Sequence, residues 1–266
     1  MIPGLLNTPA NAGHKQESEG IMAKNGLDVK TAALSIVMLA MGCLQRITDR
    51  RDHLPGMAVL YGFSGFGKST AAAYISNKMN AYYVECKSVW SKKAFMENIL
   101  KVMGITPGRT VSDMLDQICE QLAKSGRPLI IDEMDHIVEK VAVEVVRDIY
   151  EGSRAPILLI GEERLPAKLA KWERFHGRIM EWAAAPPADL NDAKVLADFY
   201  CAGVTVGDDL LTAIHGKSKG SVRRIVTNLD LVRKEAQSQG LSSISMKEWG
   251  KRDLYTGEAP QPRRFQ

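Results

Sequence analysis

Residues 62–69 of this 266-residue chain read GFSGFGKS, and this octapeptide constrains the fold more than any other feature. It fits the pattern G-x-x-x-x-G-K-[ST] and lies between an apolar run, residues 57–61, and a run typical of a helix that begins near Lys68. The three glycines let the backbone curl until successive N–H groups face one point, where the positive end of the following helix also lies. The octapeptide therefore predicts a phosphate-binding loop at the edge of an α/β sheet.

The same loop predicts a site for ATP and Mg²⁺. Lys68 is expected to reach the β- and γ-phosphates, Ser69 to ligate Mg²⁺, and Thr70 to lie near the α-phosphate. The loop residues expected to bind the nucleotide are Gly62, Ser64, Gly65, Phe66, Gly67, Lys68, Ser69 and Thr70.

Residues 129–133, LIIDE, predict the acidic partner of this loop. An apolar strand that ends in Asp132 places its carboxylate at the carboxyl edge of the sheet, where it would bind the nucleotide's Mg²⁺. Glu133 follows and is the candidate general base for the attacking water. Asp135 and His136 are interpreted as surface residues at a helix N-terminus rather than as site residues.

Apolar runs with strand and helix periodicity alternate along the chain. This order predicts an α/β fold, in which helices cover both faces of a five-stranded parallel sheet, followed by a small all-helical C-terminal lid. The expected strands are 57–61, 82–86, 128–132, 156–161 and 178–182. The expected organisation is a flexible arm (1–26), a nucleotide-binding core (27–186), a helical lid (187–250) and a flexible basic tail (251–266).

Composition narrows the setting. The chain is 45% hydrophobic and 25% charged with a formal net charge of +4, which is typical of a globular protein and permits an anionic partner. Its apolar stretches are too short to cross a bilayer and no secretory signal is visible, so we expect a cytoplasmic protein without a membrane partner. The four cysteines are widely spaced and predict free thiols rather than a zinc site or disulfides.

These motifs resemble those of AAA+ ATPases and, within them, the target-selection ATPases of Mu-like phages and related transposons, of which transposition protein B of phage Mu is the type. The resemblance covers about residues 28–249 and is carried by MAVLYGFSGFGKST, LIIDEMDHI, ILLIGEERL, WERFHGRIMEW and GKSKGSVRRI. It implies an ATPase that assembles with ATP as a helical filament or ring on duplex DNA, independently of base sequence, and that selects target DNA or activates a transposase.

The resemblance also implies roles for three arginines. Arg178 or its rival Arg174 would be the finger that reaches the γ-phosphate of a neighbouring subunit, and Arg223 would contact the nucleotide from its own chain. Either finger candidate could instead pair with a nearby glutamate. One departure concerns the end of the fourth strand: these ATPases often carry Asn or Thr there, whereas this chain has Gly-Glu-Glu at 161–163. Weak hydrolysis that requires stimulation by DNA and assembly is consistent with that change.

A basic segment follows the second expected strand, where AAA+ assemblies present loops to a central channel. Its side chains are interpreted either as phosphate contacts or as a solvated helix face, and Trp90 within it as a core residue. The candidate DNA-binding residues are Lys87, Ser88, Ser91, Lys92 and Lys93. A second basic set, Arg46, Arg50 and Arg51, is expected to contact the nucleotide base or a neighbouring subunit at least as readily as DNA.

Three other functions fit the same motifs. A helicase loader would prefer single-stranded DNA, and a secretion-linked ATPase would act on a protein partner. A nucleotide-gated structural protein would bind ATP with little turnover.

Overall fold

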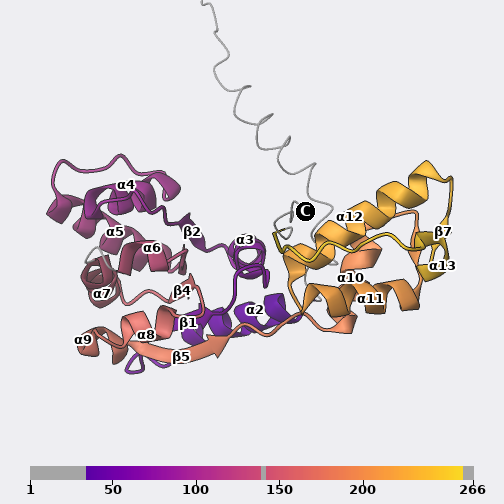
Figure 1. Ribbon diagram of the computed structural model, residues 1–266. Helices are drawn as coiled ribbons and strands as arrows, with labels where there is room; N and C mark the ends of the chain where they lie inside the picture. The colour runs from indigo at the N-terminus through magenta and orange to yellow at the C-terminus, as the bar shows by residue number, and fades with distance from the viewer. Residues whose placement is uncertain (1–33, 139–141, 260–266) are drawn as a thin grey trace, which may run out of the picture.

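The computed structural model describes residues 34–138 and 142–259. Its centre is a parallel five-stranded sheet with strand order β2-β3-β4-β1-β5 (Figure 1). The strands are β1 (Met57–Tyr61), β2 (Tyr82–Glu85), β3 (Leu129–Asp132), β4 (Ile157–Gly161) and β5 (Ile179–Ala184). The predicted α/β class and five-stranded parallel sheet are confirmed.

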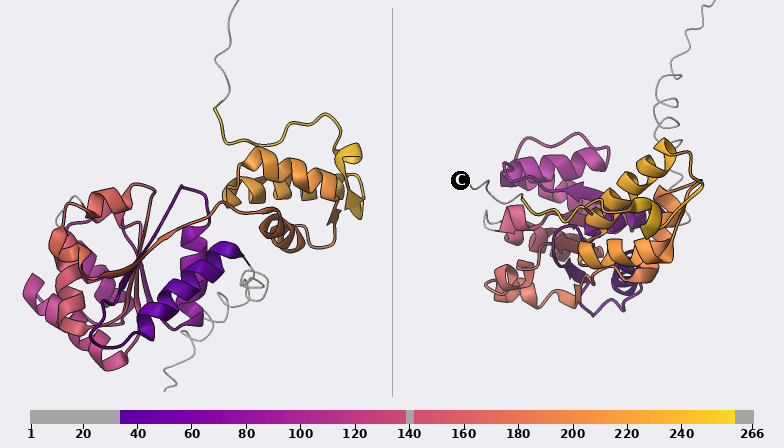
Figure 2. Two further views of the ribbon diagram at one scale, coloured as in Figure 1. Left: turned by 90° about the horizontal axis from the view of Figure 1, so that it is seen from below. Right: turned by 45° about the vertical axis from the view of Figure 1, so that its right-hand side comes forward.

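Helices cover both faces of the sheet (Figure 2). On one face lie α2 (Ser35–Thr48) and α3 (Lys68–Lys78). On the other lie α4 (Lys92–Val102), α5 (Val111–Ser125), α6 (Asp135–Val138), α7 (Ala142–Ser153), α8 (Leu165–Leu169) and α9 (Glu173–His176). The expected start of the first helix at Val29 and the expected arm at 1–26 lie outside the described residues.

Each strand is apolar along most of its length because both of its faces are buried. Alternate residues point to opposite faces, so Ala58 and Leu60 pack with α2 and α3, while Met57 and Val59 pack with the other helical layer. The register aligns Tyr61 with Gly161 in the neighbouring strand. The parallel strands therefore bring the loop after β1, the end of β3 and the end of β4 to one edge of the sheet.

The C-terminal helical layer, residues 190–249, is called the lid here. It contains α10 (Leu190–Tyr200), α11 (Asp208–Ser218), α12 (Val222–Ser238) and α13 (Met246–Trp249). It is not all-helical as expected, because β6 (Thr205–Val206) and β7 (Ser243–Ile244) pair in parallel. Two-residue strands give too short an alternation to be recognised in a sequence.

Residues 251–259 lie along α12 in Figure 1. The Asn228 side chain, fully buried, donates to the Tyr255 carbonyl at 2.9 Å and accepts from the Tyr255 amide at 2.7 Å. An amide side chain thus pairs with the backbone as a strand would. The expectation of a flexible tail from residue 251 is corrected for 251–259, whereas 260–266 lie outside the described residues.

The lid is joined to α2 as well as to β5. The Ser35 amide and hydroxyl both donate to Asp192 Oδ1, at 2.8 and 3.1 Å. Asp192 is buried and also takes part in the capping box of α10 with Asp189. This contact fixes the start of α2 against the lid, beside the loop that follows β1. Within 34–138 and 142–259, no helix is both long and apolar enough for a bilayer span.

Candidate nucleotide-binding site

The loop between β1 and α3 has the curled backbone that its glycines predict. Gly67, the residue before α3, has a φ of 87°, a left-handed conformation that favours glycine. A Cβ atom on Gly65 would lie 2.7 Å from the Ser221 hydroxyl, so that position also requires glycine for close approach. The loop therefore leaves its backbone open toward one side.

Lys68 begins α3 and lies over this loop. Its Nζ donates to the carbonyls of Gly62, at 2.6 Å, and Phe63, at 3.0 Å. Burial lowers the pKa of Lys68, and nearby acids, chiefly Glu133 and Asp132, oppose that effect. The ammonium thus stands between the loop backbone and the acids of β3.

Asp132 is buried at the end of β3 with both oxygens oriented. The Tyr83 hydroxyl, from neighbouring β2, donates to Oδ2 at 2.9 Å, and the Glu133 amide donates to Oδ1 at 2.8 Å. Tyr83 was not identified from the sequence, because its contact with Asp132 depends on the pairing of β2 with β3. Two donors fix the plane of this carboxylate before any ligand arrives.

Glu133 leaves the strand in a left-handed conformation, with a φ of 54°. Burial, followed by the charge of Asp132, raises the pKa of Glu133. His136, one turn into α6, has its Nε2 4.0 Å from Glu133 Oε2. The carboxylate is thereby held at the pocket as a stronger base than an exposed glutamate.

A pocket of about 310 Å³ lies between the core and the lid. One end is polar and is formed by the loop, the β3 acids and the turn after β4. The other end is apolar and is formed by the start of α2 and by α10 and α12; its lining includes Ile36, Val37, Val195, Phe199, Tyr200 and Val226.

The N-terminus of α12 contacts the phosphate loop directly. The Arg223 amide donates to the Gly65 carbonyl at 3.1 Å, and the Ser221 hydroxyl donates to the same oxygen at 3.4 Å. The Arg223 side chain lines the pocket. The lid thus supplies a cation to the site and is bonded to the loop that would hold the phosphates.

The structure brings most predicted site residues together. Those that line the pocket are Ser64, Gly65, Gly67, Lys68, Ser69, Thr70, Asp132, Glu133 and Arg223. Gly62 and Phe66 do not line it: the Gly62 carbonyl holds Lys68, and the Phe66 ring packs near Phe63 and against the core.

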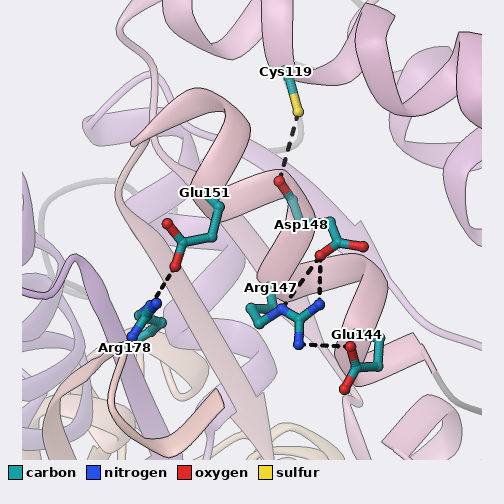
Figure 3. A network of polar contacts seen from close by, with 6 residues as sticks. All are labelled: Cys119, Glu144, Arg147, Asp148, Glu151 and Arg178. Carbon is teal, nitrogen blue, oxygen red and sulfur yellow. Dashed lines mark hydrogen bonds and ion pairs between the residues drawn. The ribbon is translucent and has the colours of Figure 1, made fainter. Parts of the chain in front are cut away.

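The two finger candidates lie outside this pocket. Arg178 forms an ion pair with Glu151 of α7, as Figure 3 shows. Beside it, Arg147 pairs with Glu144 at 2.7 Å and Asp148 at 2.9 Å. Arg174 is exposed on α9.

The basic segment between β2 and α4 is exposed, with Trp90 packed against the core. Lys87 and Lys92 point from this exposed stretch, and Lys93 lies 3.8 Å from Glu97. Ser91 caps α4 by accepting from the Ala94 amide at 3.2 Å, and Ser88 lies in the turn before it. The segment presents cations together with the free amide end of a helix.

The second basic set does not reach the nucleotide pocket. Arg46 pairs with Glu181 at 2.6 Å, and Arg50 donates to the carbonyls of Ile47 and Arg154. These groups precede β1, at the sheet edge opposite the phosphate loop, so the expected contact with the nucleotide base is wrong. Helix α2 separates the two ends: its first turn lines the pocket and its last turn carries these arginines.

The comparisons with known proteins agree on the core. Residues 50–169 match the family model described as AAA domain. No curated protein matches the chain in sequence. Among solved structures, the Aeropyrum pernix ORC2 protein in its ADP form is similar with a TM-score of 0.62 and 18% identity, over 80% of this chain and 65% of that one.

Two further structures are similar at 14% identity. For Cdc6p from Pyrobaculum aerophilum the TM-score is 0.60, over 90% of this chain and 66% of that one. For the Aeropyrum pernix ORC1 protein in complex with DNA it is 0.59, over 80% and 62%. The chain thus spans less than two thirds of each of these three proteins. It contains an AAA domain within residues 50–169 and has the fold of Orc- and Cdc6-type AAA+ ATPases.

Proposed function

We propose that this chain binds and hydrolyses ATP with Mg²⁺ and uses the nucleotide state to control assembly on duplex DNA. The observation that carries the proposal is convergence: Lys68, Asp132 and Arg223 come from three distant parts of the sequence and line one pocket. A phosphate loop, an acidic strand end and a lid cation meet the needs of a bound triphosphate.

The residues present fit ATP and Mg²⁺. The backbone at Gly65 and Gly67 is open, and a side chain at either glycine would crowd α12. Ser69 and the oriented carboxylate of Asp132 offer the oxygen ligands that Mg²⁺ prefers. When bound, Mg²⁺ would neutralise phosphate charge and polarise the terminal phosphate.

The chain's own groups would then divide the work. Lys68 would hold the β- and γ-phosphates, and Arg223 would add a second cation from the lid. Glu133 would accept the proton of the attacking water, for which its raised pKa suits it. Because Arg223 and the phosphate loop are bonded through Gly65, hydrolysis would change the seating of the lid.

Assembly would supply a third cation in trans. Arg178 is held by Glu151 within its own chain, so a neighbouring subunit would have to compete with that ion pair. Arg174 is already exposed. Turnover measured against protein concentration distinguishes them: the true finger variant, Arg178→Ala or Arg174→Ala, should lose the concentration-dependent rise while retaining nucleotide binding. Loss in neither variant would contradict a finger from this segment.

Duplex DNA is the proposed partner. The net charge is positive, the basic segment at 87–93 is exposed, and a structure of similar fold is described in complex with DNA. Removing Lys87, Lys92 and Lys93 together should weaken binding without changing its independence of base sequence, and should lower the salt slope by roughly one per lost phosphate contact.

Filter retention of duplex DNA with ATP, ADP or no nucleotide tests the proposal directly. We expect retention with ATP alone, and equal retention in all three would contradict nucleotide control. A parallel arm with single-stranded DNA separates the helicase-loader function, which predicts preference for the single strand. A lack of binding to either would favour a protein partner, as in a secretion-linked ATPase.

Target selection and transposase activation are the finer part of the proposal. They rest on the motifs shared with the Mu-like target-selection ATPases. A strand-transfer reaction with a transposase of the same element should be directed to DNA carrying this protein and ATP. Transfer that is unaffected by the protein would contradict this role while leaving the ATP site intact.

A further inference from the structure

A buried carboxylate lies directly behind the wall of the phosphate end of the pocket. The side chain of Asp135 is 5% exposed, although the sequence indicated a surface residue. Its Oδ2 accepts from the Glu162 amide at 2.5 Å, and the Lys168 ammonium lies 3.0 Å from its Oδ1. Asp135 thus joins three segments: α6, the turn after β4, and α8.

The contact with the turn explains Gly161. A Cβ atom there would lie 2.3 Å from Asp135 Oδ2 and 2.6 Å from Leu165 Cδ2. Gly161 also lines the pocket, beside Glu162. An asparagine or threonine at the end of β4 would therefore displace Asp135. The departure from the expected polar residue is coupled to the burial of this carboxylate.

The arrangement concentrates negative charge where a γ-phosphate would lie. Asp132, Glu133 and Glu162 line the pocket, and Asp135 lies behind them. Among the described residues, Asp135 Oδ1 has no hydrogen-bond donor in good geometry. The ammonium of Lys168 is therefore the group that offsets its charge. A buried carboxylate deprived of its partner would repel a nearby phosphate and raise its own pKa.

We infer, building on the proposed ATPase function, that Lys168 is a positioning residue which, by pairing with Asp135, lets this acidic site accept the γ-phosphate without a polar side chain at the end of β4. The pair sets the preference for ATP over ADP, because the γ-phosphate is the group nearest these acids. Lys168 acts through Asp135 and the Glu162 turn rather than on the reacting atoms.

The test compares two nucleotides on one set of variants. Calorimetric titration with Mg²⁺-ADP and a non-hydrolysable Mg²⁺-ATP analogue gives the ratio of their affinities. In Lys168→Met the affinity for the analogue should fall about tenfold, as expected for one uncompensated charge at partly screened distance, with about a twofold change or less for ADP. The double variant Asp135→Asn/Lys168→Met should restore the ratio, because it removes the unpaired charge.

Lys171→Met is the matched control, since it removes an exposed lysine two residues beyond the end of α8. Thermal unfolding of each variant confirms that it is folded at the titration temperature. Equal losses for both nucleotides, an unchanged ratio in Lys168→Met, or no recovery in the double variant would each overturn the inference. Failure of the unmodified protein to bind either nucleotide would instead contradict the proposed function.

Discussion

The two ends of the pocket are built in different ways. The phosphate end comes from one continuous loop and from the ends of adjacent parallel strands, and its donors and acids are fixed by hydrogen bonds within the core. The apolar end is assembled from α2, α10 and α12, which lie far apart in the sequence. The comparison teaches that the chemistry is built into the core, whereas enclosure of the nucleotide depends on how the lid docks.

The strongest test of the phosphate end is Lys68→Ala. Lysine would make charge-assisted hydrogen bonds to two phosphates, so its loss should cost about 4 kcal/mol of binding, or roughly a thousandfold in affinity. Calorimetric titration with Mg²⁺-ATP measures it, with the exposed Lys78→Ala at the other end of α3 as a control. Affinity within a few fold of the unmodified protein would show that phosphate binding does not depend on this end.

Glu133→Gln separates chemistry from binding within that same end. The amide cannot accept the proton of water, so turnover should fall at least about a hundredfold while ATP affinity is retained. Assemblies on DNA should then persist, and phosphate release together with filter retention measures both effects. Rapid disassembly, or turnover equal to that of the unmodified protein, would remove Glu133 from the role of base.

The same contrast explains what the sequence reveals. The phosphate loop and the β3 acids are contiguous motifs, so Lys68 and Asp132 were predictable, as were the sheet strands, because apolar runs of this length are legible locally. Tyr83, Asp135 and the apolar wall were not. Their roles depend on strand register and on contacts across more than a hundred residues, and isolated polar residues such as Asp135 carry no local sign of burial.

Phe199→Ala tests the apolar end. Its ring lines the pocket from α10, packed edge-on against Tyr200 with ring centroids 4.9 Å apart. Loss of an aromatic surface for the base should weaken ATP and ADP alike by about tenfold, roughly 1–2 kcal/mol. Leu231→Ala, an exposed apolar residue of α12, serves as the control. A selective loss of ATP alone would mean that the two ends are not separable in function.

The smallest effect is expected where the ends meet. Ser221 caps α12 and donates to the Gly65 carbonyl, so Ser221→Ala should lower the free energy of unfolding by about 1 kcal/mol and weaken both nucleotides a few fold. Ser245→Ala removes an equivalent cap from α13, away from the pocket, and should cost similar stability without changing affinity. Thermal unfolding and titration of both variants decide the point. If the two variants bind nucleotide equally well, the lid closes the apolar end without help from its bond to the phosphate loop; if only Ser221→Ala weakens binding, that bond links the two ends and gives the nucleotide state a direct route to the lid.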